Sequence, residues 1–413
     1  MTGNNKIEEK VLLVAVEFNN QDTKDSLIEL EELVKTAGGT TIEKITQNRE
    51  SIHPTTYVGK GKLNEIREKV LALDITTVVC DDELSPAQLR NLEEALEVKV
   101  IDRTTIILDI FAQRAQTKEG IIQVELAQLQ YRLTRLVGLG KSLSRLGGGI
   151  GTRGPGEKKL ETDRRHIRNT ISQLSKELKD IKKHRELIRE QRKKKKIPVI
   201  AIVGYTNAGK STLLNRLTQA DVLEEDKLFA TLDPTTRMLE LPSGQQVFLT
   251  DTVGFIRKLP HHLINAFQGT LEEVRYADII LHVVDSSNHQ AQKHIHVVYE
   301  TLNDLKALDK PIITVYNKQD ALDENLILKD FKAQKEVSIS ALKEEGIAYL
   351  LEAIEDILKQ QSKQIEKIIP YNEGNILNTI RTYGQIEVEE YKNEGVYIKA
   401  YLPVEIYEKV NRI

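Results

Sequence analysis

The chain has 413 residues, of which 40% are hydrophobic and 29% charged, with a formal net charge of −3 at pH 7. This length exceeds one compact core, so we expect two to four domains, and the charge gives no overall basic signal for nucleic acid. A single cysteine excludes an internal disulfide, and no apolar stretch is long enough to cross a bilayer.

Residues 1–116 alternate short apolar runs with helical patterns. Such alternation is typical of a small, mostly parallel α/β domain. The turn Gly59-Lys60-Gly61-Lys62 is rich in the residues that hold anions, but it lacks phosphate-loop spacing. A plain strand-to-helix turn is therefore the favoured interpretation. Strands are expected at 11–18, 40–46, 76–80 and 98–101, and helices at 25–36, 63–73 and 85–97.

Residues 117–196 carry apolar residues at steps of three and four, on both sides of a glycine-rich connector at 147–156. This pattern predicts an antiparallel helical hairpin. The second arm, 157–196, has 16 Lys or Arg against 7 Asp or Glu. It is either a solvated helix face with a charged linker or a contact for a polyanion, and the local excess favours nucleic acid. The candidate RNA contacts are Arg153, Lys158, Lys159, Arg164 and Arg165.

A phosphate-loop pattern runs from Gly204 to Ser211, after the apolar run 197–203 and before the helical run 212–217. The strand–loop–helix context is the one this motif requires. Its glycines let main-chain N–H groups point at phosphate oxygens at a helix N-terminus. Lys210 then supplies a positive charge to the phosphates, and the Ser211 hydroxyl is a ligand for Mg²⁺.

Three further motifs follow strand-like runs of a doubly wound sheet within 197–361. Asp251-Thr252-Val253-Gly254 offers a carboxylate for a Mg²⁺-bound water and a main-chain N–H for the γ-phosphate. In Asn317-Lys318-Gln319-Asp320, the last carboxylate accepts hydrogen bonds from guanine N1–H and its 2-amino group, which adenine lacks. Ser340-Ala341-Leu342 is expected to complete the base pocket through main-chain N–H groups. The sequence therefore predicts a GTP site.

Two regions around this domain remain. Between the phosphate loop and Asp251, three threonines at 231, 235 and 236 compete as the ligand of Mg²⁺ and γ-phosphate. After 361–364, a polar linker, residues 365–413 alternate apolar and polar residues around a turn at 393–395. We expect a β-hairpin there, in a small C-terminal α/β domain.

Together these motifs and the preceding hairpin resemble the HflX family of GTPases, related to Obg, over nearly the whole chain. The resemblance implies that Thr231 is the switch ligand, with Thr235 and Thr236 beside it. It implies catalytic roles for Lys210, Thr231 and Gly254, and Mg²⁺ bound by Ser211, Thr231 and, through water, Asp251. The expected nucleotide site comprises Gly204, Tyr205, Thr206, Asn207, Ala208, Gly209, Lys210, Ser211, Thr212, Phe229, Ala230, Thr231, Leu232, Asp233, Asp251, Thr252, Val253, Gly254, Asn317, Lys318, Gln319, Asp320, Ser340, Ala341 and Leu342.

Two residues bear on the mechanism. Phe255 stands where Ras-like enzymes carry the Gln that orients the attacking water, so hydrolysis should be slow until a partner completes the site. Asn207 resembles the Asn that helps to bind K⁺ in related enzymes, and simple structuring of the loop is the alternative.

The resemblance implies a cytoplasmic, monomeric GTPase that binds the large ribosomal subunit and its rRNA and splits or rescues ribosomes under stress. A peripheral membrane fraction is a second possible location. The main alternative is an RNA-remodelling protein with a second nucleotide, ATP, in the N-terminal domain. A signalling GTPase acting at a membrane ranks last, since no lipidation motif is present.

Overall fold

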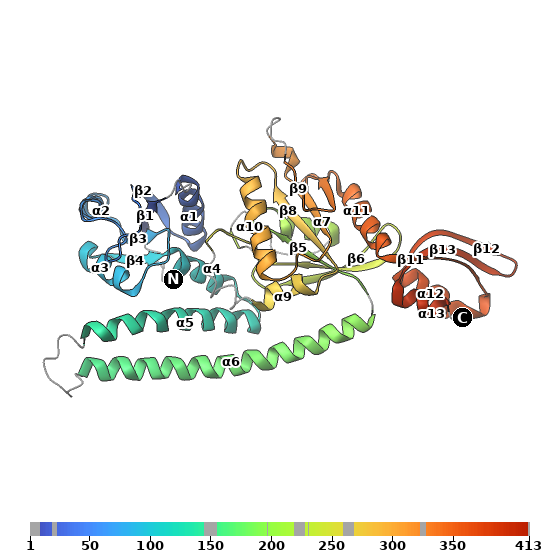
Figure 1. Ribbon diagram of the computed structural model, residues 1–413, viewed down its shortest axis with the longest axis horizontal. Coiled ribbons are helices and arrows are strands. Elements are labelled where there is room, and N and C mark those ends of the chain that lie inside the picture. Colours follow the sequence, from blue (N-terminus) through green and yellow to red (C-terminus); the bar gives the residue numbers. More distant parts are fainter. Residues whose placement is uncertain are drawn as a thin grey trace, which may run out of the picture. The chain divides into compact units, whose positions relative to one another are not determined.

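The computed structural model describes residues 9–18, 23–143, 155–195, 197–218, 228–229, 231–258, 268–322 and 328–411. The chain divides into two compact units. The first unit comprises residues 1–183, 227–229 and 257–267, and the second unit comprises 184–226, 230–256 and 268–413. Both contain sheets with flanking helices (Figure 1). The predicted multidomain α/β class is confirmed, while the four domain boundaries stay a prediction.

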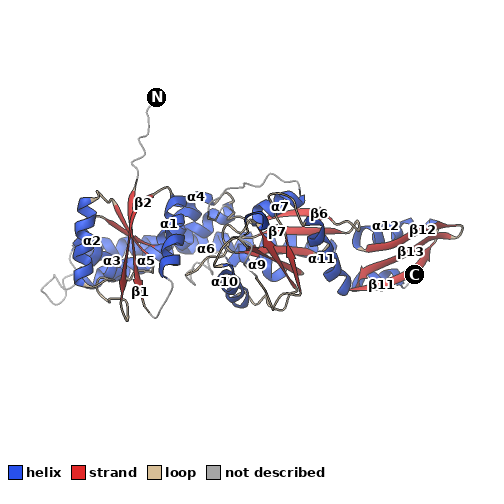
Figure 2. Cartoon of the chain, turned by 90° about the horizontal axis from the view of Figure 1, so that it is seen from above, coloured by secondary structure: helices blue, strands red, loops and turns tan. Residues whose placement is uncertain are grey.

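The first unit is built on a parallel sheet in the order β2-β1-β3-β4. Figure 2 shows α1 and α4 on one face of this sheet and α2 and α3 on the other. The expected strands and helices up to residue 101 are found with small shifts at their ends. The elements are β1 (Lys10–Glu17), α1 (Thr23–Ala37), β2 (Thr40–Asn48), α2 (Lys60–Ala72), β3 (Thr77–Cys80), α3 (Pro86–Leu96), β4 (Lys99–Asp102) and α4 (Arg103–Arg114).

Helix α4 was not expected from the sequence, because no loop precedes it. Asp102 ends β4 and at once caps the helix, with its carboxylate accepting hydrogen bonds from the Thr105 N–H at 3.0 Å and the Thr105 hydroxyl at 2.8 Å. A side-chain cap satisfies N–H groups that the first helical turn leaves without partners. The strand therefore passes directly into the helix.

Two long helices, α5 (Lys118–Leu143) and α6 (Pro155–Lys195), cover the region of the expected hairpin. Lys118 at the start of α5 pairs with Glu177 of α6 at 2.5 Å. Apolar residues of α5 such as Ile122 and Leu126 are buried. Helix α5 packs on α3 and α4 as well, so its apolar residues do not serve the hairpin alone. The glycine-rich connector lies outside the described residues.

The second unit contains a six-stranded sheet in the order β10-β9-β8-β5-β7-β6, parallel except for β6. Helices α7 and α11 contribute to the main apolar core on one face, and α9 and α10 pack against the other. This is the predicted doubly wound sheet. Its elements are β5 (Val199–Gly204), α7 (Lys210–Thr218), β6 (Thr235–Glu240), β7 (Gln246–Asp251), α9 (Gln268–Tyr276), β8 (Ile279–Asp285), α10 (Ala291–Asp304), β9 (Ile312–Asn317), η1 (Gln319–Ala321), β10 (Lys335–Ser338) and α11 (Ile347–Gln360).

The end of the chain forms an antiparallel sheet in the order β11-β13-β12, whose core is shared with α12 and α13. The expected hairpin is confirmed as β12 and β13. The polar linker expected at 361–364 is wrong, because β11 starts at Ser362 and pairs with β13 from there. It begins with three polar residues, and its buried positions are Ile365 and Ile369. The elements are β11 (Ser362–Ile369), η2 (Tyr371–Glu373), α12 (Gly374–Tyr383), β12 (Gln385–Lys392), β13 (Gly395–Pro403) and α13 (Val404–Asn411).

Candidate nucleotide site

The predicted phosphate loop connects β5 to α7 at the carboxyl edge of the second unit's sheet. Both glycines are required by close approaches. A Cβ on Gly204 would lie 2.2 Å from the Val283 carbonyl oxygen. A Cβ on Gly209, whose φ is +89°, would lie 2.3 Å from Asn317 Nδ2. The loop therefore packs directly on the ends of the neighbouring strands. Its main chain leads into the N-terminus of α7, where main-chain N–H groups favour anions.

Lys210 is the first residue of α7 and is buried. Its Nζ donates a hydrogen bond to the Tyr205 carbonyl oxygen at 2.8 Å. Burial lowers the pKa of Lys210 to about 8, although the nearby Asp251 acts in the opposite direction. Desolvation disfavours the charged form of a lysine, and a phosphate group at the loop would favour it. The side chain is thus held in place for an anionic ligand.

Three oxygen-bearing side chains converge next to the loop. Ser211 Oγ lies 2.8 Å from Thr231 Oγ1 and donates a hydrogen bond to Asp251 Oδ2 at 2.9 Å. Asp251 is fully buried, burial raises the pKa of its carboxyl, and no hydrogen bond from another described residue reaches its Oδ1. Hydroxyl and carboxylate oxygens are the donors that Mg²⁺ prefers. This donor set fits Mg²⁺ completed by water and phosphate oxygens.

The other two candidate threonines lie elsewhere. Thr235 and Thr236 belong to β6, and the Thr236 hydroxyl is 3.0 Å from that of Thr250. Within the described ranges, no group of three or more His, Cys, Asp or Glu side chains could hold a metal ion by itself. Of the three threonines, Thr231 is the one that the structure brings to Ser211.

Gly254 and Phe255 lie against the phosphate loop. The Phe255 N–H donates to the Gly204 carbonyl oxygen at 3.1 Å, and the Phe255 carbonyl accepts from the Thr206 N–H at 2.8 Å. A Cβ on Gly254 would lie 2.9 Å from Thr206 Cα, so a larger residue would not fit without displacement. The Phe255 side chain is 2% exposed. It is buried and apolar, and it cannot orient a water molecule.

The expected base motif is braced by its own side chains. Asn317 Nδ2 donates to the Ala208 carbonyl oxygen at 2.9 Å, and Asn317 Oδ1 accepts from the Ala341 N–H at 2.9 Å. Asp320 is exposed, and the Ser340 hydroxyl donates to its Oδ1 at 2.6 Å. This hydrogen bond holds the pKa of the Asp320 carboxyl below its usual value. The carboxylate therefore stays an acceptor at neutral pH.

The predicted use of residues 340–342 differs in detail from the structure. The Ser340 N–H bonds the Glu345 carbonyl oxygen and the Ala341 N–H bonds Asn317. These two N–H groups are taken within the protein because the segment folds into a tight turn. The contribution of Ser340 to the site is its hydroxyl on Asp320, and Leu342 is exposed.

Two residues of the site were not anticipated. Asp285, the last residue of β8, accepts a hydrogen bond from Lys318 Nζ at 2.7 Å and so fixes that lysine stem. Ser286 donates its N–H to the Asn317 carbonyl oxygen at 3.0 Å. Both follow a buried strand at the carboxyl edge of a parallel sheet, where ligand sites form. Their position directly after a buried strand is the feature of the sequence that could have identified them.

The remaining candidates are distributed as follows. Ala230 and Arg153 lie outside the described residues. Lys158 and Lys159 are in α6, where Arg164 is half-buried and Arg165 exposed. Phe229 belongs to the first unit. The remaining expected residues of the nucleotide site belong to the second unit: Tyr205, Thr206, Asn207, Ala208, Thr212, Leu232, Asp233, Thr252, Val253 and Gln319.

The Gly59–Lys62 turn has partners of its own. Gly59 donates its N–H to Gln47 Oε1 at 2.8 Å, and Lys62 pairs with Glu65 at 2.7 Å. These contacts support a structural turn at the start of α2.

No helix in the part of the chain that the structure describes is both long and apolar enough to cross a membrane.

Three family models match consecutive parts of the chain. They are described as a GTP-binding GTPase N-terminal region (residues 24–112), a GTP-binding GTPase middle region (114–192) and a 50S ribosome-binding GTPase (199–318). The matches cover α5, most of α6 and the motifs from the phosphate loop to Lys318. They agree with the site described above.

Curated relatives match over nearly the full length. A protein named GTPase HflX from Lacrimispora saccharolytica is 62% identical over 97% of this chain and 95% of its own. Proteins of the same name from Caldanaerobacter subterraneus and Escherichia coli are 51% and 44% identical, over 98% and 96% of this chain and 93% and 94% of theirs.

Proposed function

The chain belongs to the HflX family of GTPases, and from this premise we propose that its GTP cycle controls binding to the large ribosomal subunit. It binds and hydrolyses GTP as a member of that family. The finer proposal is that the GTP-bound form holds the subunit and splits or rescues ribosomes under stress, and that hydrolysis releases it. A cytoplasmic location goes with this role.

The observation that carries the proposal is the convergence of Ser211, Thr231 and Asp251. Mg²⁺ bound there would screen the negative charge on phosphate oxygens during transfer. Thr231 and Asp251 come from separate segments of the chain, so a γ-phosphate that recruits both would order both. This supports Lys210, Thr231 and Gly254 as the residues that respond to the third phosphate. A switch of this kind can report GTP or GDP to a partner.

The buried Phe255 supports a partner-dependent reaction. Since this side chain cannot orient water, the chain alone lacks one component of efficient hydrolysis. The family model that covers the site is described as a 50S ribosome-binding GTPase. We propose that the large ribosomal subunit is the partner that supplies or orders the group that orients the attacking water.

Helix α6 supports contact with rRNA. The described basic residues Arg165, Arg168, Lys176 and Lys179 are exposed on it. Phosphate neutralisation by such side chains provides most of the sequence-independent affinity for nucleic acid. Arg153, Lys158, Lys159 and Arg164 remain candidates for the same contact. Replacing Arg165 and Arg168 by Gln should weaken binding to large subunits and reduce its dependence on salt.

The nucleotide dependence of binding tests the proposal. Large subunits and the full-length chain are centrifuged together with a non-hydrolysable GTP analogue or with GDP. We expect the chain to pellet with the subunits in the analogue and to stay in the supernatant in GDP. Equal pelleting in both nucleotides would contradict the proposed cycle. Small subunits at the same concentration serve as the control.

K⁺ at the phosphate loop is a further part of the proposal. Asn207 is exposed and has a φ of +61°, a conformation that Asn adopts more readily than most residues. This supports loop structuring as well as K⁺ binding, so two variants are needed. Asn207→Gly keeps the left-handed conformation without the carboxamide, whereas Asn207→Ala strains it. If K⁺ binds, GTP turnover is faster in K⁺ than in Na⁺, and both variants lose that difference.

The alternative with an ATP site in the first unit has weaker support, because the Gly59–Lys62 turn bonds Gln47 and Glu65. Binding of GTP and of ATP to a variant of the base motif separates the two hypotheses. The full-length Asp320→Asn variant should bind GTP more weakly, and ATP binding that persists in it at the affinity of the unmodified chain would favour the alternative.

A further inference from the structure

His294 of α10 stacks on Tyr205 of the phosphate loop. The two rings are nearly parallel, with an interplanar angle of 5°, and their centroids lie 3.7 Å apart. Tyr205 is 6% exposed, and His294 is half-buried. Both residues belong to the second unit, so the contact is internal to one compact unit. The nucleotide site predicted from the sequence does not include His294.

The course of the chain explains why His294 lies at the loop. Strand β8 is the neighbour of β5 in the sheet and parallel to it, and α10 begins shortly after β8 ends at Asp285. The first turn of α10 therefore lies at the carboxyl edge of the sheet, beside the loop that follows β5. Ala291, Ile295 and Val298 are buried. His294 lies at the margin of this buried stripe.

The main chain of Tyr205 joins several parts of the site. Its carbonyl oxygen accepts hydrogen bonds from Lys210 Nζ at 2.8 Å and from the Ala208 N–H at 3.3 Å. The residues on either side of Tyr205 form main-chain hydrogen bonds with Phe255. A shift of Tyr205 would therefore displace the oxygen that holds the Lys210 ammonium.

Other contacts brace the second half of the loop. Asn317 Nδ2 donates to the Ala208 carbonyl oxygen at 2.9 Å, and Gly209 packs closely against the same carboxamide. These contacts do not act on the first half. The loop from Gly204 to Ser211 contains a single aromatic residue, Tyr205. Its stack on His294 is thus a side-chain contact that braces the first half.

We infer that His294 is a positioning residue of the nucleotide site: by stacking on Tyr205, it holds the first half of the phosphate loop in place before a nucleotide binds. A loop that is already held in its binding conformation loses less conformational freedom on binding, which increases affinity. GTP and GDP both place phosphate groups on this loop. Loss of the stack should therefore weaken the binding of both by the same factor.

The inference rests on the part of the proposed function that assigns nucleotide binding to this loop, and not on the ribosomal role. It is therefore tested without ribosomes. If the unmodified chain does not bind fluorescent GDP, the proposed function itself fails. If the chain binds fluorescent GDP and replacement of His294 has no effect, the inference alone fails.

The test measures the affinity of the full-length chain for fluorescent GDP and for a fluorescent non-hydrolysable GTP analogue in Mg²⁺. His294→Gln keeps a polar side chain without the ring. It should weaken the binding of both nucleotides by roughly twofold to tenfold, the range expected for loss of an aromatic pair. His294→Phe keeps a ring that can stack and should retain the affinity of the unmodified chain. This rescue separates stacking from any hydrogen bond of the imidazole.

A double-mutant cycle shows whether the effect passes through the Tyr205 ring. Tyr205→Leu should weaken the binding of both nucleotides by at least the same factor as His294→Gln. Adding His294→Gln to Tyr205→Leu should cause no further loss, because the stack is already absent. A role of His294 only in the stability of α10 would instead give the same loss in both backgrounds.

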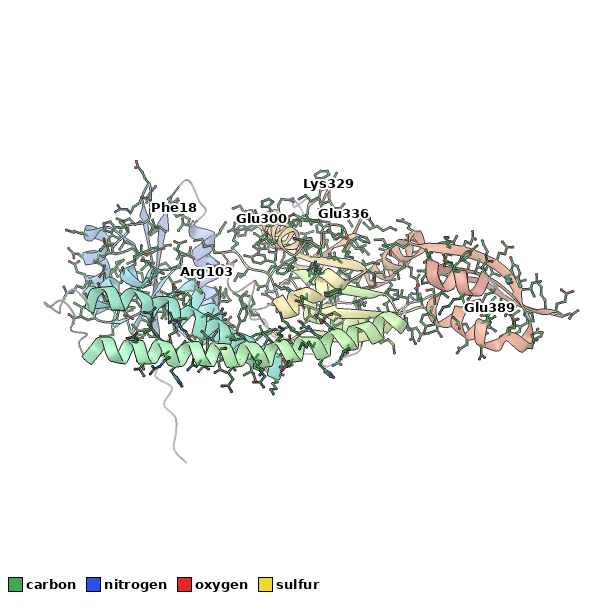
Figure 3. All side chains as sticks on the ribbon, turned by 60° about the horizontal axis from the view of Figure 1, so that its bottom comes forward. Phe18, Arg103, Glu300, Lys329, Glu336 and Glu389 are labelled. Carbon is green, nitrogen blue, oxygen red and sulfur yellow. The ribbon has the colours of Figure 1, made fainter. Side chains whose placement is uncertain are left out.

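His296→Gln is the matched control. His296 lies on the same helix with a side-chain exposure of 72%, and its Nε2 is 3.3 Å from Oε1 of Glu300, which is labelled in Figure 3. Its replacement should leave both affinities unchanged. The inference is overturned if His294→Gln leaves both affinities unchanged, if His294→Phe loses as much affinity as His294→Gln, or if the double variant loses further affinity. Should His294→Gln fail to fold, unchanged affinities of Tyr205→Leu would overturn the inference.

Discussion

The Asn317 carboxamide donates a hydrogen bond to the main-chain oxygen of Ala208 at 2.9 Å. This bond joins the strand end that carries the base motif to the phosphate loop. The other end of the same carboxamide accepts the Ala341 N–H at 2.9 Å. A single buried side chain thus connects three segments of the nucleotide site.

Asn317→Ala should therefore weaken binding of GTP and GDP to a similar extent. Removing the carboxamide leaves the Ala208 oxygen and the Ala341 N–H without partners, which costs about 1–3 kcal/mol for each buried group. We expect a loss in affinity of roughly 10-fold to 100-fold, measured by calorimetric titration. Asn303→Ala, at an exposed position of α10, is the control and should have no effect. Selective loss of one nucleotide would contradict the bracing role.

Asp320→Asn should change which base is bound. The carboxylate accepts from two donors of guanine, and the amide would present a donor in place of one acceptor. We expect weaker GTP binding and stronger binding of xanthosine triphosphate, whose 2-oxo group accepts a hydrogen bond. Competition of both nucleotides against fluorescent GDP measures the exchange. Parallel loss of both nucleotides would mean that Asp320 supports the loop without reading the base.

Asp102 should be the main polar anchor between β4, α4 and α5. It is 0% exposed and accepts from the Leu84 N–H at 3.0 Å, from Arg135 at 2.6 Å and from the Tyr131 hydroxyl. Asp102→Ala removes the acceptor that these donors share and should lower the free energy of unfolding of the first unit by about 3–5 kcal/mol. Tyr131→Phe should cost about 1 kcal/mol. Hydrogen exchange at amides of β3 and α4 reads out this unit alone, and equal losses for the two variants would contradict the assignment.

Acid should destabilise the second unit through His282 and Asp330. Burial lowers the pKa of His282 and so favours its neutral form in the folded chain, although the nearby Asp330 acts in the opposite direction. For Asp330, burial acts to raise the pKa, but hydrogen bonds, among them those from Thr314 at 2.6 Å and Tyr299 at 2.8 Å, hold it well below its usual value.

In both cases the unfolded chain binds the proton more readily, so stability falls as pH falls. The loss attributable to His282 begins below about pH 6.5 and cannot exceed about 1.4 kcal/mol per pH unit. Urea unfolding between pH 7.5 and 5 measures it. His282→Gln should flatten the slope over this range, and an unchanged slope would contradict the role of this side chain.

The nucleotide motifs were predictable because each occupies a short stretch after an apolar strand. Features without such a local signal were missed. Helix α4 starts at Arg103 directly from a strand, with no glycine or proline between them. Strand β11 was taken for a linker because its first three residues, Ser362, Lys363 and Gln364, are all polar and none of them is buried. The contact of Lys258 with Asp81 joins residues 177 positions apart, and no local pattern encodes it.

The most direct test of the account is the rate of GTP hydrolysis by the full-length chain with and without purified large ribosomal subunits. Because Phe255 is buried and apolar, the chain alone should hydrolyse GTP slowly. Large subunits should raise the rate by on the order of 100-fold or more, as partner-completed GTPase sites do, and small subunits should not. An unchanged rate at saturating large subunits would contradict the claim that the ribosome completes this site.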